Sequence, residues 1–280
     1  MTKKTEIVMP KIKLLCSDID GTLLNSEHKI NIEDKQTIQR AWNEYHIPFA
    51  LVSGRFRSGV TFIQKELDIP CIYSCFNGNY VEWEGKVIND VPINIQIIKD
   101  LIPIIEKAGL VPVVFDKDSY YFSEHTDWYD LQVSVFKTEG HIKPWKQFYT
   151  EWEEKKHSVY KILAKDHNPQ KIIDFEKQLK LLQYPGIEVV RSSPSILEIL
   201  PAGTSKASTL SHLSKYFNIS TDSIMSFGDF MNDYEMIKDC PHGVAMGNAL
   251  KELKDVAWYV TKSNDEGGIA HALNKFVFFA

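Results

Sequence analysis

The stretch Cys16-Ser17-Asp18-Ile19-Asp20-Gly21-Thr22-Leu23 places two aspartates, at positions i and i+2, after an apolar run. Residues 12–16 are mostly β-branched or apolar, as in a fully buried strand, and Gly21 ends that strand. Side chains two residues apart in an extended chain point to the same side, so both carboxylates reach one small volume. Such charges repel unless a cation neutralises them or one keeps a proton. The pair indicates either a Mg²⁺ site that acts on an oxyanion or an acidic turn at a strand end.

Size and composition restrict the classes of protein to which the chain can belong. A chain of 280 residues can bury a large core and suits one large or two moderate domains. Its apolar fraction of 44% and charged fraction of 25% are ordinary for a globular enzyme. The net charge of −5 argues against nucleic acid and anionic lipid as partners. The longest apolar stretches are far shorter than the ~20 residues that a membrane helix needs.

The cysteines and the first residues bear on the compartment. No His or Cys cluster completes a zinc site around the four cysteines, and Cys71 and Cys75 are too far apart in a strand to bond each other. Residues 1–13 carry lysines but lack the apolar core of a signal peptide, so we expect a short flexible lead-in. We therefore expect buried free thiols and a cytoplasmic protein. The four cysteines are Cys16, Cys71, Cys75 and Cys240.

The order of apolar strands and amphipathic helices predicts two domains. Strands at 12–17, 48–52 and 71–75 alternate with two helices, one at 32–45 and one that ends near residue 67. This order is typical of a doubly wound parallel sheet of the α/β class. The middle of the chain instead has neighbouring strands without helical crossovers, which favours an antiparallel sheet with helices on one face. The alternating pattern returns near residue 205. We predict a Rossmann-type α/β core at 1–87 and 201–280, with an α+β insert at 88–200.

Polar side chains follow several of the predicted core strands. Ligands of an open parallel sheet bind beyond the carboxyl ends of its strands, near the point where the strand order reverses. Carboxylates at such a place suit Mg²⁺, whereas Ser, backbone N–H groups and an ammonium suit phosphate. Alone, Ser53-Gly54 could simply end a strand. The residues at these strand and helix ends are Asp18, Asp20, Ser53, Gly54, Lys206, Asp229, Asn232 and Asp233.

At these positions the chain resembles the haloacid dehalogenase-like phosphohydrolases, specifically the Cof-type group with a late-inserted (type C2) α/β cap. The resemblance covers the whole core in the right order. One departure is Ala207, where the family commonly has glycine. The matching stretches are 18–24, 52–55, 197–199, 203–206, 228–233, 243–249 and 263–268.

The resemblance implies a role for each site residue. Asp18 is expected to attack phosphorus and form an aspartyl-phosphate, and Asp20 to act as general acid and then base. Mg²⁺ is expected to be held by Asp18, the backbone carbonyl of Asp20, and Asp229. Asp233 is expected to orient Lys206 or metal-bound water. The groups expected to bind phosphate oxygens are the N–H groups of Ile19 and Gly54 and the side chains of Ser53, Lys206 and Asn232.

The resemblance further implies a Mg²⁺-dependent phosphatase that acts on small phosphorylated metabolites, with sugar phosphates as the leading class. Two alternatives stay open: a phosphosugar mutase that returns phosphate to the sugar, and a non-catalytic regulator that binds a phosphorylated ligand. The insert at 88–200 is expected to act as the cap that selects the leaving group. We expect a monomer or weak homo-oligomer.

Overall fold

The computed structural model describes residues 11–278, in which strand β1 (Leu14–Ser17) leads directly into Asp18. The expected lead-in at 1–13 therefore lies mostly outside the described residues. The chain divides into two structural units, and the short segment Gly54–Val60 belongs with the middle of the chain rather than with its flanking strands. The first unit is Met1–Ser53, Thr61–Asn89 and Ser205–Ala280, and the second is Gly54–Val60 and Asp90–Thr204.

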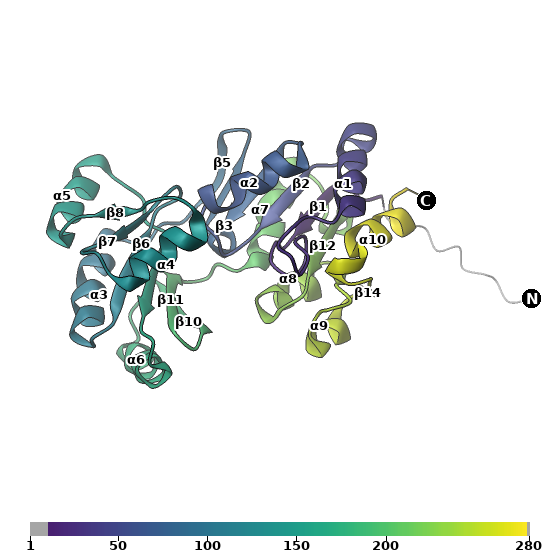
Figure 1. The fold of residues 1–280 in the computed structure, drawn as a ribbon. Helices are drawn as coiled ribbons and strands as arrows, with labels where there is room; N and C mark the ends of the chain where they lie inside the picture. Colours follow the sequence, from purple (N-terminus) through teal and green to yellow (C-terminus); the bar gives the residue numbers. More distant parts are fainter. Residues whose placement is uncertain (1–10, 279–280) are drawn as a thin grey trace, which may run out of the picture. The chain divides into compact units, whose positions relative to one another are not determined.

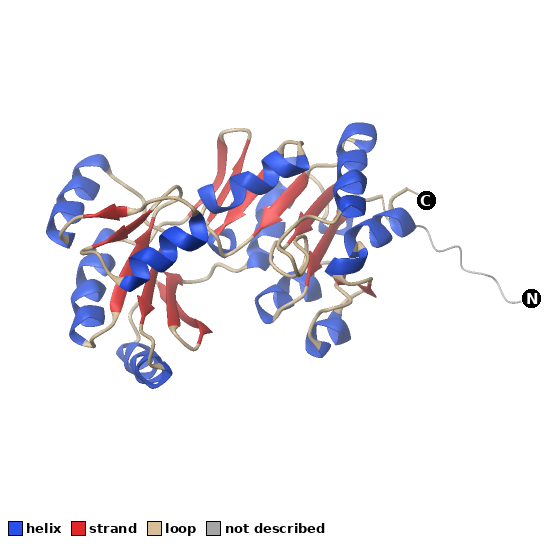
Figure 2. Ribbon diagram, viewed as in Figure 1, coloured by secondary structure: helices blue, strands red, loops and turns tan. Residues whose placement is uncertain are grey.

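An eight-stranded sheet forms the centre of the first unit, in the order β14-β13-β12-β1-β2-β3-β4-β5 (Figures 1 and 2). Its first six strands in that order pair in parallel, whereas β4 pairs antiparallel with β3. A tight turn connects β4 to β5, with Glu84 and Gly85 both at positive φ. The remaining strands are β2 (Phe49–Val52), β3 (Cys71–Cys75), β4 (Tyr80–Trp83), β5 (Lys86–Asp90), β12 (Ile224–Gly228), β13 (His242–Ala245) and β14 (Tyr259–Val260).

Helices cover both faces of this sheet (Figure 1). The crossovers β1–β2–β3 and β12–β13–β14 step away from β1 in opposite directions, so right-handed connections place their helices on opposite faces. The doubly wound α/β prediction is thereby confirmed. The helices are α1 (Ile32–Tyr45), α2 (Ser58–Leu67), α7 (Lys206–Phe217), α8 (Tyr234–Asp239), α9 (Lys251–Val256) and α10 (Gly268–Phe276), with 3-10 turns η1 (Phe76–Gly78), η2 (Thr221–Ser223), η3 (Met231–Asp233) and η4 (Asn264–Glu266).

The second unit is built on a six-stranded sheet in the order β10-β11-β9-β6-β7-β8. Its pairs are antiparallel except β7 with β8, in agreement with the antiparallel sheet predicted for the middle of the chain. The strands are β6 (Val111–Phe115), β7 (Tyr120–Phe122), β8 (His141–Ile142), β9 (Lys161–Lys165), β10 (Ile187–Ser193) and β11 (Ile196–Pro201).

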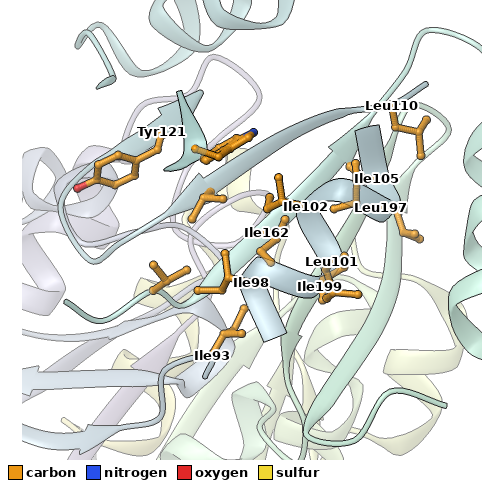
Figure 3. Close-up of a cluster of buried hydrophobic side chains, with 14 of the residues drawn as sticks. Ile93, Ile98, Leu101, Ile102, Ile105, Leu110, Tyr121, Ile162, Leu197 and Ile199 are labelled. Atoms are coloured by element: carbon orange, nitrogen blue, oxygen red, sulfur yellow. The ribbon is translucent and has the colours of Figure 1, made fainter. Parts of the chain in front are cut away.

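One face of this sheet carries the hydrophobic core of the second unit. Ile162 of β9 and Leu197 and Ile199 of β11 pack there against the apolar side of a helix that presents Ile98, Leu101, Ile102 and Ile105 (Figure 3). The aromatics Trp145, Phe148 and Trp152 belong to the same cluster. The helices that contribute are α3 (Ile95–Lys107), α5 (Trp145–Lys155) and α6 (Pro169–Leu182).

A further helix, α4 (Asp127–Phe136), was not predicted and lies against the opposite face of that sheet. Its Gln132 accepts a hydrogen bond from Lys165, whose strand neighbour Ala164 faces the core described above. Successive residues of a strand point to opposite faces, so α4 and the other three helices cannot share one. The expectation of helices on a single face was therefore incomplete.

Candidate active site

Three neighbouring parallel strands end at the residues that the sequence singled out. Ser17 of β1 is level with Phe227 of β12 and with Leu51 of β2, so the residues that follow these strands emerge at the same edge of the sheet. The strand order reverses at β1. From β1 the chain adds β2 and β3 on one side, and later adds β12, β13 and β14 on the other side. Asp18 thus lies at the kind of crevice where open α/β sheets bind ligands.

A buried lysine joins two buried aspartates at this edge. Lys206 is the first residue of α7, and its Nζ lies 2.6 Å from Oδ1 of Asp18 and 2.6 Å from Oδ1 of Asp233. These three residues are at most 5% exposed. A cation at a helix N-terminus opposes the helix dipole, and here two carboxylates offset that cost. The arrangement brings together side chains that lie 188 and 27 residues apart in the sequence.

The ionisation of these groups reflects their burial. Loss of water raises the pKa of the Asp18 carboxyl, although the Lys206 ammonium and the Ile19 N–H oppose the rise. The two carboxylates raise the pKa of Lys206 above its usual range despite burial, so Lys206 is a cation. Burial also raises the pKa of Asp229 to about 6, against a hydrogen bond from Thr22. One ammonium thus faces three carboxyl groups, which leaves the site short of positive charge.

These carboxyl groups have the composition of a site for a hard cation. Asp18, Asp229 and Asp233 each offer an oxygen, and these oxygens lie within 4.8 Å of one another. Oxygen donors at this density suit Mg²⁺. A bound dication would offset the burial, and the smaller repulsion between carboxylates, that together raise the pKa values of Asp18 and Asp229. Gly21 makes room for this arrangement: a Cβ there would lie 2.4 Å from Oδ2 of Asp229.

Asp233 differs from the other two carboxylates because both of its oxygens are engaged. Oδ1 accepts from Lys206, and Oδ2 accepts from the backbone N–H groups of Asp229 and Phe230 at 3.0 and 3.1 Å. The carboxylate therefore ties the lysine to the loop that carries Asp229. Gly228 leaves space for it, since a Cβ there would lie 2.5 Å from Cβ of Asp233.

The remaining predicted residues include Asp20, whose charge contributes to the raised pKa of Asp229. Asp20 and Asn232 are exposed, and the Asp20 side chain is not among the clustered carboxylates found in residues 11–278. Ser53 is buried directly after β2, and its N–H donates to Ser74 O at 2.8 Å. Gly54 follows in the chain and belongs to the second unit.

Thr22 and Asn248 lie within the matched stretches 18–24 and 243–249, and the resemblance assigned no role to either residue. Thr22 is fully buried, and its hydroxyl donates to Oδ1 of Asp229 at 2.7 Å. Asn248 donates to the Gly21 carbonyl at 2.8 Å and accepts from Asn264 N–H. Both therefore hold the loops around the carboxylates. The sequence offered one indication of this role for Thr22: its hydroxyl follows Asp20 by two residues, in a turn that contains Gly21.

Other expectations concern the rest of the molecule. All four cysteines are buried free thiols, as predicted. Across residues 11–278, each helix is too short or too polar to traverse a lipid bilayer.

Comparison with known proteins agrees with this geometry. The haloacid dehalogenase-like hydrolase family model matches residues 15–273. The 5-amino-6-(5-phospho-D-ribitylamino)uracil phosphatase YwtE of Bacillus subtilis (strain 168) is 30% identical, over 95% of this chain and 98% of its own. The phosphatase YitU of the same strain, which carries the same functional name, is 28% identical over 94% and 97%.

Solved structures agree as well. The crystal structure of a haloacid dehalogenase-like hydrolase from Bacteroides thetaiotaomicron superposes with a TM-score of 0.84 and 28% identity, covering 95% of this chain and 99% of that chain. The match therefore extends over both units rather than over the α/β sheet alone. This chain belongs to the haloacid dehalogenase-like hydrolases of the Cof type and is a phosphoric monoester hydrolase.

Proposed function

We propose that this enzyme is a Mg²⁺-dependent phosphatase that hydrolyses small phosphorylated metabolites through an aspartyl-phosphate on Asp18. The observation that carries the proposal is the buried Asp18–Lys206–Asp233 group at the reversal point of the sheet, with Asp229 beside it. A nucleophilic carboxylate needs neighbouring positive charge to approach an anionic phosphoryl group. At this edge of the sheet, Lys206 and a cation held by the clustered carboxylates would supply that charge.

In the proposed reaction, an Asp18 oxygen bonds to phosphorus while the bond to the leaving oxygen breaks. The Asp20 carboxyl gives its proton to that oxygen, which leaves as an alcohol. The Asp20 carboxylate then takes a proton from water, and the water oxygen attacks phosphorus and releases Asp18. The contrast between buried Asp18 and exposed Asp20 supports this division of roles, because a solvent-exposed carboxyl exchanges protons readily.

Asp18, Asp229 and the backbone carbonyl of Asp20 would hold the metal ion in this proposal. The hard oxygen donors and the raised pKa values of two of them fit a dication. Bound there, Mg²⁺ would screen the repulsion between the carboxylates and the substrate phosphoryl group. Thr22 would keep Asp229 in the orientation that such binding needs.

The phosphoryl oxygens would be bound by Lys206, by the side chains of Ser53 and Asn232, and by the N–H groups of Ile19 and Gly54. Lys206 is already fixed between two carboxylates, so it costs little reorganisation at the moment of reaction. Asp233, with both oxygens engaged, would act by holding Lys206 and the Asp229 loop in place.

Sugar phosphates and related polyol phosphates are the substrate class that we propose. The names of the relatives YwtE and YitU describe the phosphate ester of a ribityl chain, which is a sugar alcohol. The second unit would serve as the C2-type cap that selects the leaving group. The buried free thiols support action in a reducing compartment, which we propose to be the cytoplasm, as a monomer or weak homo-oligomer.

The test is release of inorganic phosphate from p-nitrophenyl phosphate by the wild type, with and without EDTA, and by Asp18→Asn. We expect EDTA and Asp18→Asn each to lower the rate by a factor of at least about 10³, since an amide is a poor nucleophile. Asp34→Asn is the matched control, because Asp34 is also a fully buried aspartate of the first unit but contacts α10 instead.

Activity that survives both treatments would contradict the proposal. A screen of sugar phosphates with and without a bisphosphate primer distinguishes the alternatives. Isomerisation faster than phosphate release indicates a mutase, and tight binding without turnover indicates a regulator.

A further inference from the structure

One stretch that matches the family, residues 197–199, has no role in the proposed reaction. In β11 its outer members, Leu197 and Ile199, belong to the core of the second unit, so Glu198 between them points to the opposite face of the sheet. Glu198 pairs with Leu163 in the β9–β11 register. The side chain of Lys161 lies on that same face, two residues before Leu163. This face therefore carries an acid and a base next to one another.

Lys161 is buried there, and its neighbours include a backbone carbonyl, a carboxylate and an aromatic ring. Its Nζ donates to the Gly54 carbonyl at 2.9 Å, lies 3.5 Å from Oε2 of Glu198, and sits 5.4 Å from the ring centre of Phe115. The side chain is 10% exposed, so the ammonium is largely removed from water and its polar contacts are strong. The shortest of these polar contacts is made to backbone, directly after Ser53.

Gly54 begins a segment that is fixed to the second unit at further points. Within Gly54–Val60, the Arg57 N–H donates to the Lys117 carbonyl at 2.8 Å, and the Arg57 guanidinium lies 2.7 Å from Asp118. Phe56 is buried among aromatic rings of that unit. Its ring partners are Phe115, Tyr120 and Phe136.

Polar groups also hold the other side of the turn. The Ser53 N–H donates to Ser74 O at 2.8 Å, and the Ser53 carbonyl accepts from Asn77 N–H at 2.9 Å. With the Gly54 carbonyl held by Lys161, both ends of the turn are fixed. No hydrogen bond within residues 11–278 uses the Gly54 N–H. Glycine has more backbone freedom than any other residue. The lysine contact, which fixes the Gly54–Arg55 peptide, therefore limits the conformations of the turn.

We propose that Lys161 is a positioning residue for phosphate binding: by holding the Gly54 carbonyl, it fixes the backbone directly after Ser53 and so keeps the Ser53–Gly54 turn in the conformation that binds the phosphoryl group. Glu198 keeps the ammonium in place. This inference rests on the proposed function, because it assumes that the Ser53–Gly54 turn binds phosphate. It gives the matched 197–199 stretch a role that neither the sequence nor the proposed chemistry supplies.

The experiment compares Lys161→Met, Lys161→Arg and Lys165→Met in the full-length protein. Lys165 is the matched control: it lies four residues along the same strand and on the same face, is 3% exposed, and donates to Gln132 instead. The quantities measured are kcat and KM for p-nitrophenyl phosphate and the inhibition constant of inorganic phosphate. Melting temperatures report the structural cost of each change.

Loss of a charged hydrogen bond that orients the turn is expected to weaken phosphate binding about tenfold. We therefore expect Lys161→Met to raise both KM and the inhibition constant about tenfold, with kcat changed much less. Lys161→Arg, which keeps a donor, should recover most of the loss. Lys165→Met should stay within about twofold of the wild type, even if it melts as early as Lys161→Met.

An unchanged inhibition constant in folded Lys161→Met, or an equal rise in Lys165→Met, overturns the inference. If Lys161→Met does not fold, Glu198→Gln decides: a rise of about threefold in the inhibition constant supports the role, and no rise overturns it. A wild type that neither turns over nor is inhibited by phosphate contradicts the proposed function itself. An active wild type with an unaffected Lys161→Met contradicts only this inference.

Discussion

At the scale of single residues, Lys206 is the group on which the buried carboxylates depend. Removing one partner of a buried ion pair leaves an uncompensated charge and costs about 3–5 kcal/mol. We therefore expect Lys206→Met, which leaves Asp18 and Asp233 without their shared cation, to lower the free energy of unfolding by an amount in that range at pH 7. Urea denaturation measures it.

The exposed Lys65 of α2 supplies the control for that experiment. Lys65→Met should change the free energy of unfolding by less than about 0.5 kcal/mol, as is usual for surface substitutions. A loss in Lys206→Met no larger than in Lys65→Met would show that the carboxylates do not need the lysine.

Asp229 is expected to be necessary for metal binding. A ligand that binds only the folded protein raises its melting temperature, so Mg²⁺ should stabilise the wild type. Asp229→Asn removes one charged donor and should abolish most of that shift, whereas Asp239→Asn, on the exposed end of α8, should preserve it. The measurement is the melting temperature with increasing Mg²⁺. An undiminished shift in Asp229→Asn would place the metal elsewhere.

The residues of the site were predictable to different degrees. Asp18 and Asp229 could be predicted because each directly follows an apolar strand. Thr22 was missed as an orienting group, because its partner Asp229 lies 207 residues away and only the fold brings them together. Lys206 was predictable from its position at a helix start, where a cation is unfavourable unless an anion is near.

At the scale of elements, Asp34 joins two helices and makes stability depend on pH. It lies in the first turn of α1, fully buried, and its Oδ1 accepts from Ala270 N–H of α10 at 2.6 Å. Burial raises its pKa to about 7, and the nearby Glu33 adds to the rise, against the N–H groups of Ala270 and Ile269. Its burial against a helix at the other end of the chain depends on tertiary packing, which the sequence alone does not reveal.

The sign of the effect follows from proton binding. Between pH 4 and 7 the folded carboxyl keeps a proton that the unfolded chain has lost, so stability falls as pH rises, by up to about 1.4 kcal/mol per pH unit. Asp34→Asn cannot lose a proton, and its free energy of unfolding should fall less steeply with pH over this window. Denaturation of both proteins from pH 4 to 8 checks this. Parallel curves would contradict the raised pKa.

Helix α4 shows why some elements escape prediction from sequence. Its residues 127–136 place Trp128, Gln132 and Phe136 on one side, but the strand-like composition around them gave no clear helical period. Contacts with Lys165 and with the aromatic rings of β6 and β7 stabilise it, and these are tertiary. The parallel strands, by contrast, each carry their own apolar run and were predictable.

At the scale of the whole molecule, the chain combines two units, each with its own sheet. The alternation of strands and helices led to the prediction of an insert at 88–200. The second unit also includes Gly54–Val60, through the ring contacts of Phe56 and the Arg57–Asp118 pair, which only the fold brings together. A short piece of chain next to a predicted phosphate-binding residue therefore belongs structurally to the other unit.

The measurement that tests the account most directly is the location of the phosphoryl group during turnover. Asp20→Asn should still pass phosphate from p-nitrophenyl phosphate, whose leaving group needs little protonation, but should hydrolyse the adduct slowly. Acid quenching followed by digestion and mass spectrometry is then expected to find one phosphoryl group on Asp18, together with a burst of nitrophenol equal to the enzyme. A phosphoryl group on any other residue would contradict the account.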